Sequence, residues 1–266
     1  MKNRRAKKRG LQKRKPPLVR SIPNTPTRLY AIGDIHGCAD EMNALLQFLK
    51  GSEGLNENDQ VVFIGDYIDR GPASKDVIDQ LIELRQSFPK TIFLKGNHED
   101  MLLSFLGLGG HAGQAYLSNG GFEFFRSYQI QPLAEVSEIL SQLPEGHKAF
   151  FEGLETGVVL AEFLFVHAGI RPARAIAEQN AHDLIWIRSE FTSAPHELGK
   201  TVVFGHTPYE DVLIHLPYKI GIDTGLVYGN KLTCVELVEG TLYQVDFGER
   251  DVRVSSLKDR LVSPPA

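Results

Sequence analysis

The sequence predicts an α/β protein in which two β-sheets pack against each other. From residue 28 onward, short apolar runs alternate with longer segments of helical spacing, as in proteins with a parallel sheet. In the C-terminal third, short apolar runs follow one another and are separated by turns that contain glycine. Most apolar runs also end in a small cluster of Gly, Asp and His residues.

The N-terminal half of the body shows a β-α-β-α-β pattern. The helical segments carry stripes of large apolar residues, such as Leu45, Leu46 and Leu49, which favour packing of one face against a sheet. Helices that connect successive strands make those strands parallel. We expect strands over 28–32, 61–64 and 91–94, helices over 40–50 and 74–88, and a further helix-like stretch that ends near residue 106.

The rest of the body is expected to form one helix and then a second, mostly antiparallel sheet packed on the first. The helix is expected over 132–143, and a hairpin turn is expected at Val238-Glu239-Gly240. No repeat or Gly/Ser linker divides the chain, so we expect a single domain over 28–250, followed by a C-terminal tail over 251–266. The expected strands are 158–166, 201–204, 218–222, 231–237 and 241–247.

Composition and charge restrict the class of protein. The 266 residues are 42% hydrophobic, which is typical of a globular protein, and no apolar run approaches a membrane span. The two cysteines, Cys38 and Cys234, form no CxxC pair, so they indicate neither a disulfide framework nor a Cys-based zinc site. A reducing, cytoplasmic location is expected.

The net charge of −4 conceals a basic N-terminal segment. Residues 1–28 contain eleven Lys/Arg and no acid, whereas the remaining residues contain 18 basic and 33 acidic side chains. The segment has four prolines and almost no apolar periodicity, so a disordered tail is expected over residues 1–27. Two interpretations stay open: a solvated tail, or an electrostatic handle for nucleic acid, an anionic membrane surface or an acidic protein.

Five polar clusters follow the expected strands. Because ligands bind at the carboxyl ends of strands in open α/β sheets, these clusters can converge on one site. Asp, His and Asn side chains suit Mn, Fe or Zn, and a pair of metal ions would supply the charge that keeps two carboxylates ionised. The clusters are Gly33-Asp34-Ile35-His36-Gly37, Gly65-Asp66-Tyr67-Ile68-Asp69-Arg70-Gly71, Gly96-Asn97-His98-Glu99, His167-Ala168-Gly169 and Gly205-His206-Thr207.

The ordered set GDxHG, GDxxDRG, GNHE, HAG and GHT resembles the phosphoprotein phosphatase family of metallophosphoesterases, in particular its bacterial and phage serine/threonine phosphatases. The resemblance extends over residues 29–237. It implies the calcineurin-like metallophosphoesterase fold, with two mixed sheets packed as a sandwich and flanked by helices. It also implies two divalent metal ions, for which Mn²⁺ is expected and Fe or Zn are alternatives.

The resemblance implies a metal-ligand set and a mechanism. One metal would take two ligands from the first motif, and the first Asp of the second motif would bridge both metals. A hydroxide shared by the two metals would then attack phosphorus in line with the leaving group. The implied metal ligands are Asp34, His36, Asp66, Asn97, His167 and His206.

The same resemblance implies the residues that act on the substrate. His98 would be the general acid that protonates the leaving oxygen, and Asp69 would orient it. Asn97, Arg70 and Arg188 would bind the phosphate oxygens. The remaining polar residues are expected to have supporting roles: Glu99 as a helix cap, Asp223 as support for the metal loops, Cys38 packed beneath the site, and His111, His147, His182, His196 and His215 at the surface or in loops.

The leading functional interpretation is a metal-dependent phosphomonoesterase that acts on phosphoserine or phosphothreonine in proteins, with phosphotyrosine as a further substrate. The alternative within the superfamily is a diadenosine tetraphosphate hydrolase. The resemblance implies that those hydrolases lack the Asp before Arg in the second motif, so Asp69 favours the protein phosphatase. A non-catalytic nucleic-acid-binding protein is a distant third hypothesis, because the motif residues are complete.

Overall fold

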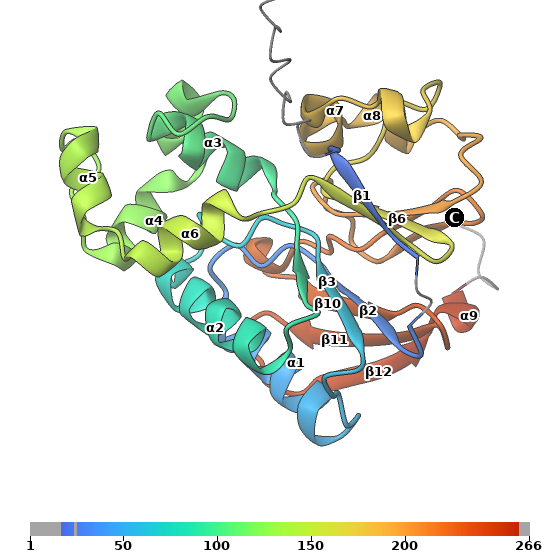
Figure 1. Cartoon of the computed structure of the whole chain (residues 1–266). Coiled ribbons are helices and arrows are strands. Elements are labelled where there is room, and N and C mark those ends of the chain that lie inside the picture. The colour runs from blue at the N-terminus through green and yellow to red at the C-terminus, as the bar shows by residue number, and fades with distance from the viewer. Residues whose placement is uncertain (1–16, 24–25, 261–266) are drawn as a thin grey trace, which may run out of the picture.

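The computed structural model describes residues 17–23 and 26–260 and confirms the predicted α/β architecture. Two mixed sheets of six strands each face one another, and helices cover the outer faces (Figure 1). Sheet A is ordered β1 (Val19–Ile22), β5 (Gly157–Leu160), β6 (Phe163–Val166), β7 (Thr201–Phe204), β9 (Lys219–Gly221) and β8 (Leu213–His215). Sheet B is ordered β12 (Val252–Ser256), β11 (Thr241–Asp246), β10 (Lys231–Glu236), β2 (Leu29–Ile32), β3 (Gln60–Phe63) and β4 (Ile92–Phe93).

The helices form three groups around this sandwich. Figure 1 shows α1 and α2 beside sheet B, α3 to α6 as a group of which α4 and α6 pack against α2, and α7 and α8 over sheet A. In the part of the chain that the structure describes, they are α1 (Ala39–Gly51), α2 (Ser74–Ser87), α3 (Asn97–Phe105), α4 (Gly121–Tyr128), α5 (Val136–Gln142), α6 (Glu145–Glu152), α7 (Ala181–Trp186), α8 (Ser189–Thr192) and α9 (Leu257–Arg260).

Alternating side chains on the central strands build the layers of the core. On β2, Leu29 and Ala31 belong to the apolar cluster between the sheets, whereas Tyr30 and Ile32 belong to the cluster shared with α1 and α2. Because successive side chains of a strand point to opposite faces, a strand with both faces buried must be apolar throughout. On the other sheet, Phe165 of β6 packs into the layer between the sheets.

The structure corrects the predicted division of strands between the sheets. The strands β10 and β11 were expected in the second sheet, yet β10 pairs antiparallel with β2, and Cys234 lies opposite Ile32. Sheet A is also not mostly antiparallel, because three of its five strand pairs are parallel. All six residues of β10 are buried, so the strand needs neighbours on both edges and cover on both faces, which the centre of sheet B provides.

The predicted tails are wrong where the structure describes them. Val19–Ile22 forms the edge strand β1, which pairs parallel with β5, and Arg20 forms a 2.7 Å ion pair with Glu155. At the other end, Val252–Ser256 pairs with β11. Both strands are short, lie at sheet edges and contain no fully buried residue, so their sequences carry little apolar pattern. The prediction of a disordered tail at residues 1–16 lies outside the described residues, as do 24–25 and 261–266.

Smaller differences concern the middle of the chain. The strand expected over 158–166 is a hairpin of β5 and β6, which turns at Ala161 with a positive φ of 49°. The helix expected over 132–143 begins only at Val136. Among the described helices, none has the length and apolar character needed to cross a membrane.

The core between the sheets makes a testable prediction. Phe165 is fully buried there, so Phe165→Ala should lower the free energy of unfolding by about 3–5 kcal/mol through lost burial and a residual cavity. Chemical denaturation followed by circular dichroism would measure the loss. Leu133→Ala is the control, because Leu133 is 84% exposed and its truncation should change stability by less than about 0.5 kcal/mol. Equal stability of the two variants would contradict this account of the core.

Candidate metal centre

The five polar clusters meet at one end of the sandwich, just beyond the carboxyl ends of β2, β3, β4, β6 and β7. Backbone hydrogen bonds join the clusters directly. The His36 N–H donates to the carbonyl of Asp66 at 2.9 Å, and the Gly205 N–H donates to the carbonyl of His167 at 2.7 Å. The side chains predicted as metal ligands are therefore brought together, although they come from positions 34 to 206 of the chain.

Asp66 lies at the centre of this arrangement and presents one carboxylate oxygen to each side. Its Oδ2 is 3.4 Å from Nε2 of His36, and its Oδ1 is 3.4 Å from Nε2 of His167. Two groups of side chains with converging ligand atoms share Asp66: one also contains His36 and His98, and the other contains His167 and His206. This is the geometry that a carboxylate needs to bridge two cations.

Backbone carbonyls fix which ring nitrogen of each central histidine is free. Nδ1 of His36 donates to the carbonyl of Ile68, and Nδ1 of His167 donates to the carbonyl of Ile64, both at 2.9 Å. Each Nε2 therefore carries a lone pair that points into the site, as in metal-ligating histidines held by an outer hydrogen bond. At His36 this lone pair accepts from Nη1 of Arg70 at 2.9 Å, so the position already favours positive charge.

The second group is completed by Asn97. Its Oδ1 lies 3.1 Å from Nε2 of His167 and 2.7 Å from Nδ1 of His206, so one amide oxygen and two imidazoles face a common point. Asp34, on the opposite side, uses Oδ2 to accept from the backbone N–H of His206 at 3.0 Å. Gly205 permits this approach, since a Cβ there would lie 2.1 Å from Oδ1 of Asp34.

The polar atoms left unpaired in the site fit bound cations. Oδ1 of Asp34, Nε2 of His98 and Nε2 of His206 are buried and have no hydrogen-bond partner among the described residues. Such orphaned atoms are costly unless a ligand, water or ion satisfies them. The donor set of carboxylate, amide and imidazole, with no thiolate, matches Mn²⁺, Fe or Zn²⁺. The residues therefore fit divalent metal ions.

Burial sets the charge state of these groups. It raises the pKa of Asp34 well above its usual range, and the neighbouring carboxylates of Asp223 and Asp66 add to this effect. Burial also lowers the pKa of His36 well below its usual range and that of His98 to about 4, so both imidazoles are neutral at pH 7. Neutral imidazoles can ligate a metal, and a bound cation would favour the ionised form of Asp34.

His98 belongs to a hydrogen-bonded chain of fully buried side chains. Its Nδ1 lies 2.6 Å from Oδ2 of Asp69, and Oδ1 of Asp69 accepts from the Tyr116 hydroxyl at 2.7 Å. The structure thus places the predicted acid and its orienting carboxylate in contact. Sequence reasoning missed Tyr116, because no motif surrounds it and it reaches Asp69 from the loop between α3 and α4.

Glu99 has a larger part than the helix cap that was predicted. Its fully buried carboxylate accepts the backbone N–H groups of Asp66, Tyr67, Ile68 and Gly96 at 2.8–3.3 Å. Only the bond to Gly96 belongs to the cap of α3. The other three fix the loop that carries Asp66, so Glu99 joins the second and third motifs.

The site is built from strained backbone. Among the described residues, eight other than glycine have a positive φ, and five of them belong to the motifs: His36, Asp66, Asp69, Arg70 and His206. Each such residue costs of the order of 1–3 kcal/mol, and such strain persists only where surrounding interactions determine the conformation. Such a concentration of strained residues indicates a functional site.

The two arginines predicted to bind phosphate lie close enough to the site for one to contact it and for the other to act on its charges. Arg70 is half-buried between His36 and the exposed ring of Tyr228, whose centroid is 5.4 Å from its Cζ. Arg188 is exposed, and its charge adds to the effect of burial in lowering the pKa of both His98 and His206. Both cations can therefore act on an anion bound at the metal residues.

The supporting residues have mixed outcomes. Cys38 is buried behind the first motif, and Asp223 is buried and accepts from the Gly225 N–H at 3.0 Å. His147 departs from the prediction, because it is buried in α6 between Tyr128 and Asp79. His196 lies in a loop as predicted, although it is buried and bonds to the carbonyl of Tyr218. These two histidines stabilise the fold away from the metal residues.

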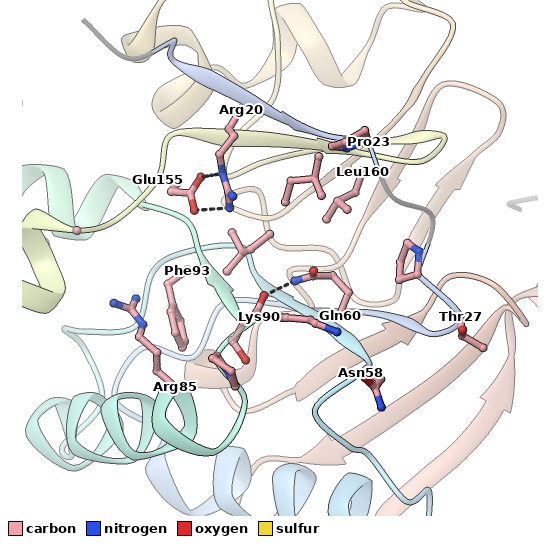
Figure 2. Close-up of a pocket in the computed structure, with 16 residues that line it drawn as sticks. Arg20, Pro23, Thr27, Asn58, Gln60, Arg85, Lys90, Phe93, Glu155 and Leu160 are labelled. Carbon is pink, nitrogen blue, oxygen red and sulfur yellow. Dashed lines mark hydrogen bonds and ion pairs between the residues drawn. The ribbon is translucent and has the colours of Figure 1, made fainter.

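A cavity of about 910 Å³ lies elsewhere, between the edges of the two sheets (Figure 2). Gln60, the first residue of β3, lines it, whereas Asp66 comes three residues after Phe63, the last residue of the same strand. The cavity is therefore at the opposite end of the sheet from the metal residues. Figure 2 shows the Arg20–Glu155 ion pair on its wall and a hydrogen bond from Gln60 to the backbone of Lys90.

A two-sheet α/β sandwich that gathers Asp, Asn and His side chains at its strand ends is the architecture of a metal-dependent hydrolase. Residues 27–236 match the family model for calcineurin-like phosphoesterases, which is most of the chain. The chain therefore belongs to the calcineurin-like phosphoesterase family, whose members hydrolyse phosphoesters with divalent metals.

Curated relatives extend over most of the chain. A protein from Oceanobacillus iheyensis named bis(5'-nucleosyl)-tetraphosphatase PrpE [asymmetrical] is 29% identical over 232 residues, which covers 78% of this chain and 88% of that protein. A protein with the same name from Anoxybacillus flavithermus is 28% identical over 229 residues and covers 78% of this chain and 89% of its own length.

Solved structures confirm the fold. A crystal structure of a protein provisionally assigned as a diadenosine tetraphosphatase has a TM-score of 0.65 at 22% identity and covers 87% of this chain and 98% of its own. A cold-active protein-tyrosine phosphatase from a psychrophilic Shewanella species has a TM-score of 0.56 at 19% identity and covers 90% and 84%. At these identities the similarity shows the fold alone.

The Tyr116–Asp69–His98 chain makes a testable prediction. Tyr116→Phe removes one hydrogen bond to Asp69 and should lower kcat by about tenfold, the smaller end of the effect of losing an outer partner in a metal site. Metal content, measured by mass spectrometry, should stay unchanged. His98→Asn is the comparison variant and should lose about 10²–10⁴ in kcat. If Tyr116→Phe retains full kcat, then the hydroxyl has no part in orienting His98.

Proposed function

We propose that this protein is a metal-dependent hydrolase that cleaves dinucleoside tetraphosphates asymmetrically. The observation that carries the proposal is the similarity to curated relatives of that name, which spans 88% of the Oceanobacillus iheyensis protein. The preference for a protein serine/threonine phosphatase, which rested on Asp69, is not supported by the names of these relatives. The asymmetric reaction adds water to the four-phosphate chain and releases a nucleoside monophosphate and a nucleoside triphosphate.

We further propose that the two groups around Asp66 hold two divalent cations, for which Mn²⁺ is the first candidate. Asp34 and His36 would bind one, Asn97, His167 and His206 the other, and Asp66 both. The ions would supply positive charge that lowers the pKa of water and offsets the charge of the phosphates. Support for this assignment comes from the shared carboxylate of Asp66 and from the buried ligand atoms without partners.

The chain's own residues have three tasks in this proposal. Arg70 and Arg188 bind phosphate oxygens, where the fork of a guanidinium suits paired oxygens better than an ammonium does. The negative charge of the bound phosphates would raise the pKa of His98, which burial otherwise keeps neutral at pH 7, so that its Nε2 can donate a proton to the leaving oxygen. Asp69 holds Nδ1 of His98, and this contact orients the ring.

A second candidate, hydrolysis of phosphoserine or phosphothreonine in proteins, is favoured by the complete Asp69–His98 pair. A serine alkoxide is a far more basic leaving group than a nucleotide phosphate, so it needs a general acid much more. A hydrolase of phosphoanhydrides alone gains less from this buried pair. The pair is therefore consistent with activity on both classes of substrate.

Removal of metal is the first test. Chelator-treated protein, freed of chelator, should lose its phosphohydrolase activity and recover it on addition of Mn²⁺, because the ligand set is otherwise left with unpaired buried atoms. Hydrolysis of diadenosine tetraphosphate followed by chromatography measures both steps. Asp66→Asn is the matched control, since Mn²⁺ should not restore a variant that lacks the shared carboxylate. Full activity in the metal-free protein would exclude the proposed centre.

Substrate choice is the second test. The Mn²⁺-loaded enzyme should hydrolyse diadenosine tetraphosphate with a kcat/KM at least about tenfold above that for a phosphoserine or a phosphotyrosine peptide, because discrimination reflects differential transition-state binding. The products should be AMP and ATP. Two molecules of ADP would refute asymmetric cleavage, and a higher kcat/KM for the phosphoserine peptide would favour the second candidate.

A further inference from the structure

We propose that the ring of Tyr228 binds a nucleobase of the substrate by stacking, next to the arginine expected to hold the phosphates. The inference rests on the proposed function and identifies the part of the site that would recognise a nucleotide. It starts from exposure: 62% of the surface of Tyr228 is open to solvent. An aromatic ring gains free energy from burial, so an exposed ring beside an active site suggests a ligand that covers it.

Tyr228 lies at the edge of the metal residues. Cζ of Arg70 is 5.4 Å from the centroid of its ring, and the same guanidinium reaches Nε2 of His36 at 2.9 Å. Burial raises the pKa of the Tyr228 hydroxyl; the charges of Asp223 and Asp66 add to this effect, whereas those of Arg70 and Arg188 oppose it. A phosphate held by Arg70 would therefore bring the nucleoside attached to it close to the Tyr228 ring.

The backbone of the turn that carries Tyr228 is held in place by hydrogen bonds and by a buried side chain. Leu226–Tyr228 is a short 3-10 turn between two glycines of positive φ, Gly225 at 68° and Gly229 at 89°. The side chain of Leu226 is buried, and the Tyr228 N–H donates to the carbonyl of Gly225 at 3.0 Å. Gly225 in turn donates to Asp223. The ring is thus held in position before any ligand arrives, which lowers the entropic cost of binding.

The chemistry of the ring defines the ligand as a nucleoside phosphate with little preference for the base. Arg70 covers one face of the ring, and the exposure of Tyr228 leaves another part of the ring open. Every base has a flat π-face, so stacking on an aromatic ring tolerates any sequence. Phosphoserine and inorganic phosphate have no ring to stack, so Tyr228 would select nucleotides over both.

Equilibrium binding tests the proposal without turnover. Isothermal titration calorimetry on the Mn²⁺-loaded full chain would use AMP and inorganic phosphate as probes. The wild type should bind AMP at least about tenfold more tightly than phosphate, and Tyr228→Ala should lose about 10- to 100-fold for AMP, in the range measured for base–aromatic stacking, with phosphate affinity unchanged. Tyr228→Phe keeps the ring and should bind both probes as the wild type does.

Two results would overturn the proposal: equal affinity of the wild type for AMP and phosphate, or equal loss of both probes in Tyr228→Ala. The outcome is separable from that of the proposed function. If AMP binds through Tyr228 but the wild type does not hydrolyse diadenosine tetraphosphate, the stacking site stands and the proposed function fails. If the tetraphosphate is hydrolysed but AMP binds no better than phosphate, the proposed function stands and the stacking site fails.

Discussion

The buried carboxylate of Glu99 is the interaction on which the rest of the site depends. It accepts the backbone N–H groups of residues 66–68 and thereby holds Asp66 in a left-handed conformation with φ 53°. The carbonyl of Asp66 then accepts from the N–H groups of Ile35 and His36, which fixes the first motif as well. A Cβ on Gly96 would lie 2.0 Å from Oδ1 of Asp66, so the third motif can approach only through glycine. One acid thus sets the position of three of the five motifs.

This construction explains why the site combines strain with buried charge. Asp34, Asp66 and Asp223 are all buried; the charge of Asp66 raises the pKa of both other carboxyl groups, and that of Asp223 also raises the pKa of Asp34. Like charges in a low-dielectric interior are destabilising unless cations compensate them. The neutral imidazoles around them provide lone pairs rather than charge. The buried carboxyl groups therefore destabilise the fold, and bound cations would reduce the repulsion between them. This is the physical reason to expect metal ions there.

The sequence allowed the layers and the location of the site to be predicted, but not every connection. The β2, β3 and β4 series was readable because its strands are apolar on both faces and alternate with helices of clear periodicity. β1 and β12 were missed, because edge strands of four or five residues carry too little apolar pattern. Within the site, Asp69 and His98 lay in motifs, whereas Tyr116 and the multiple bonds of Glu99 depend on long-range packing that no local spacing reveals. The pairing of β10 with β2 was missed for the same reason.

The Asp69–His98 pair and the ring of Tyr228 bear on different parts of a substrate. A basic leaving group needs a general acid, which the Asp69–His98 pair can provide. The pair therefore favours hydrolysis of phosphate esters and does not exclude hydrolysis of phosphoanhydrides. The exposed ring of Tyr228, by contrast, can stack on a nucleobase but has no aromatic partner in a phosphoserine side chain. Because recognition of the leaving group and recognition of the base involve different residues, the two kinds of substrate need not exclude each other chemically. Under the two proposals, the surface beside Arg70 would select between these substrates, since the proposed metal residues would meet the same phosphate in either case.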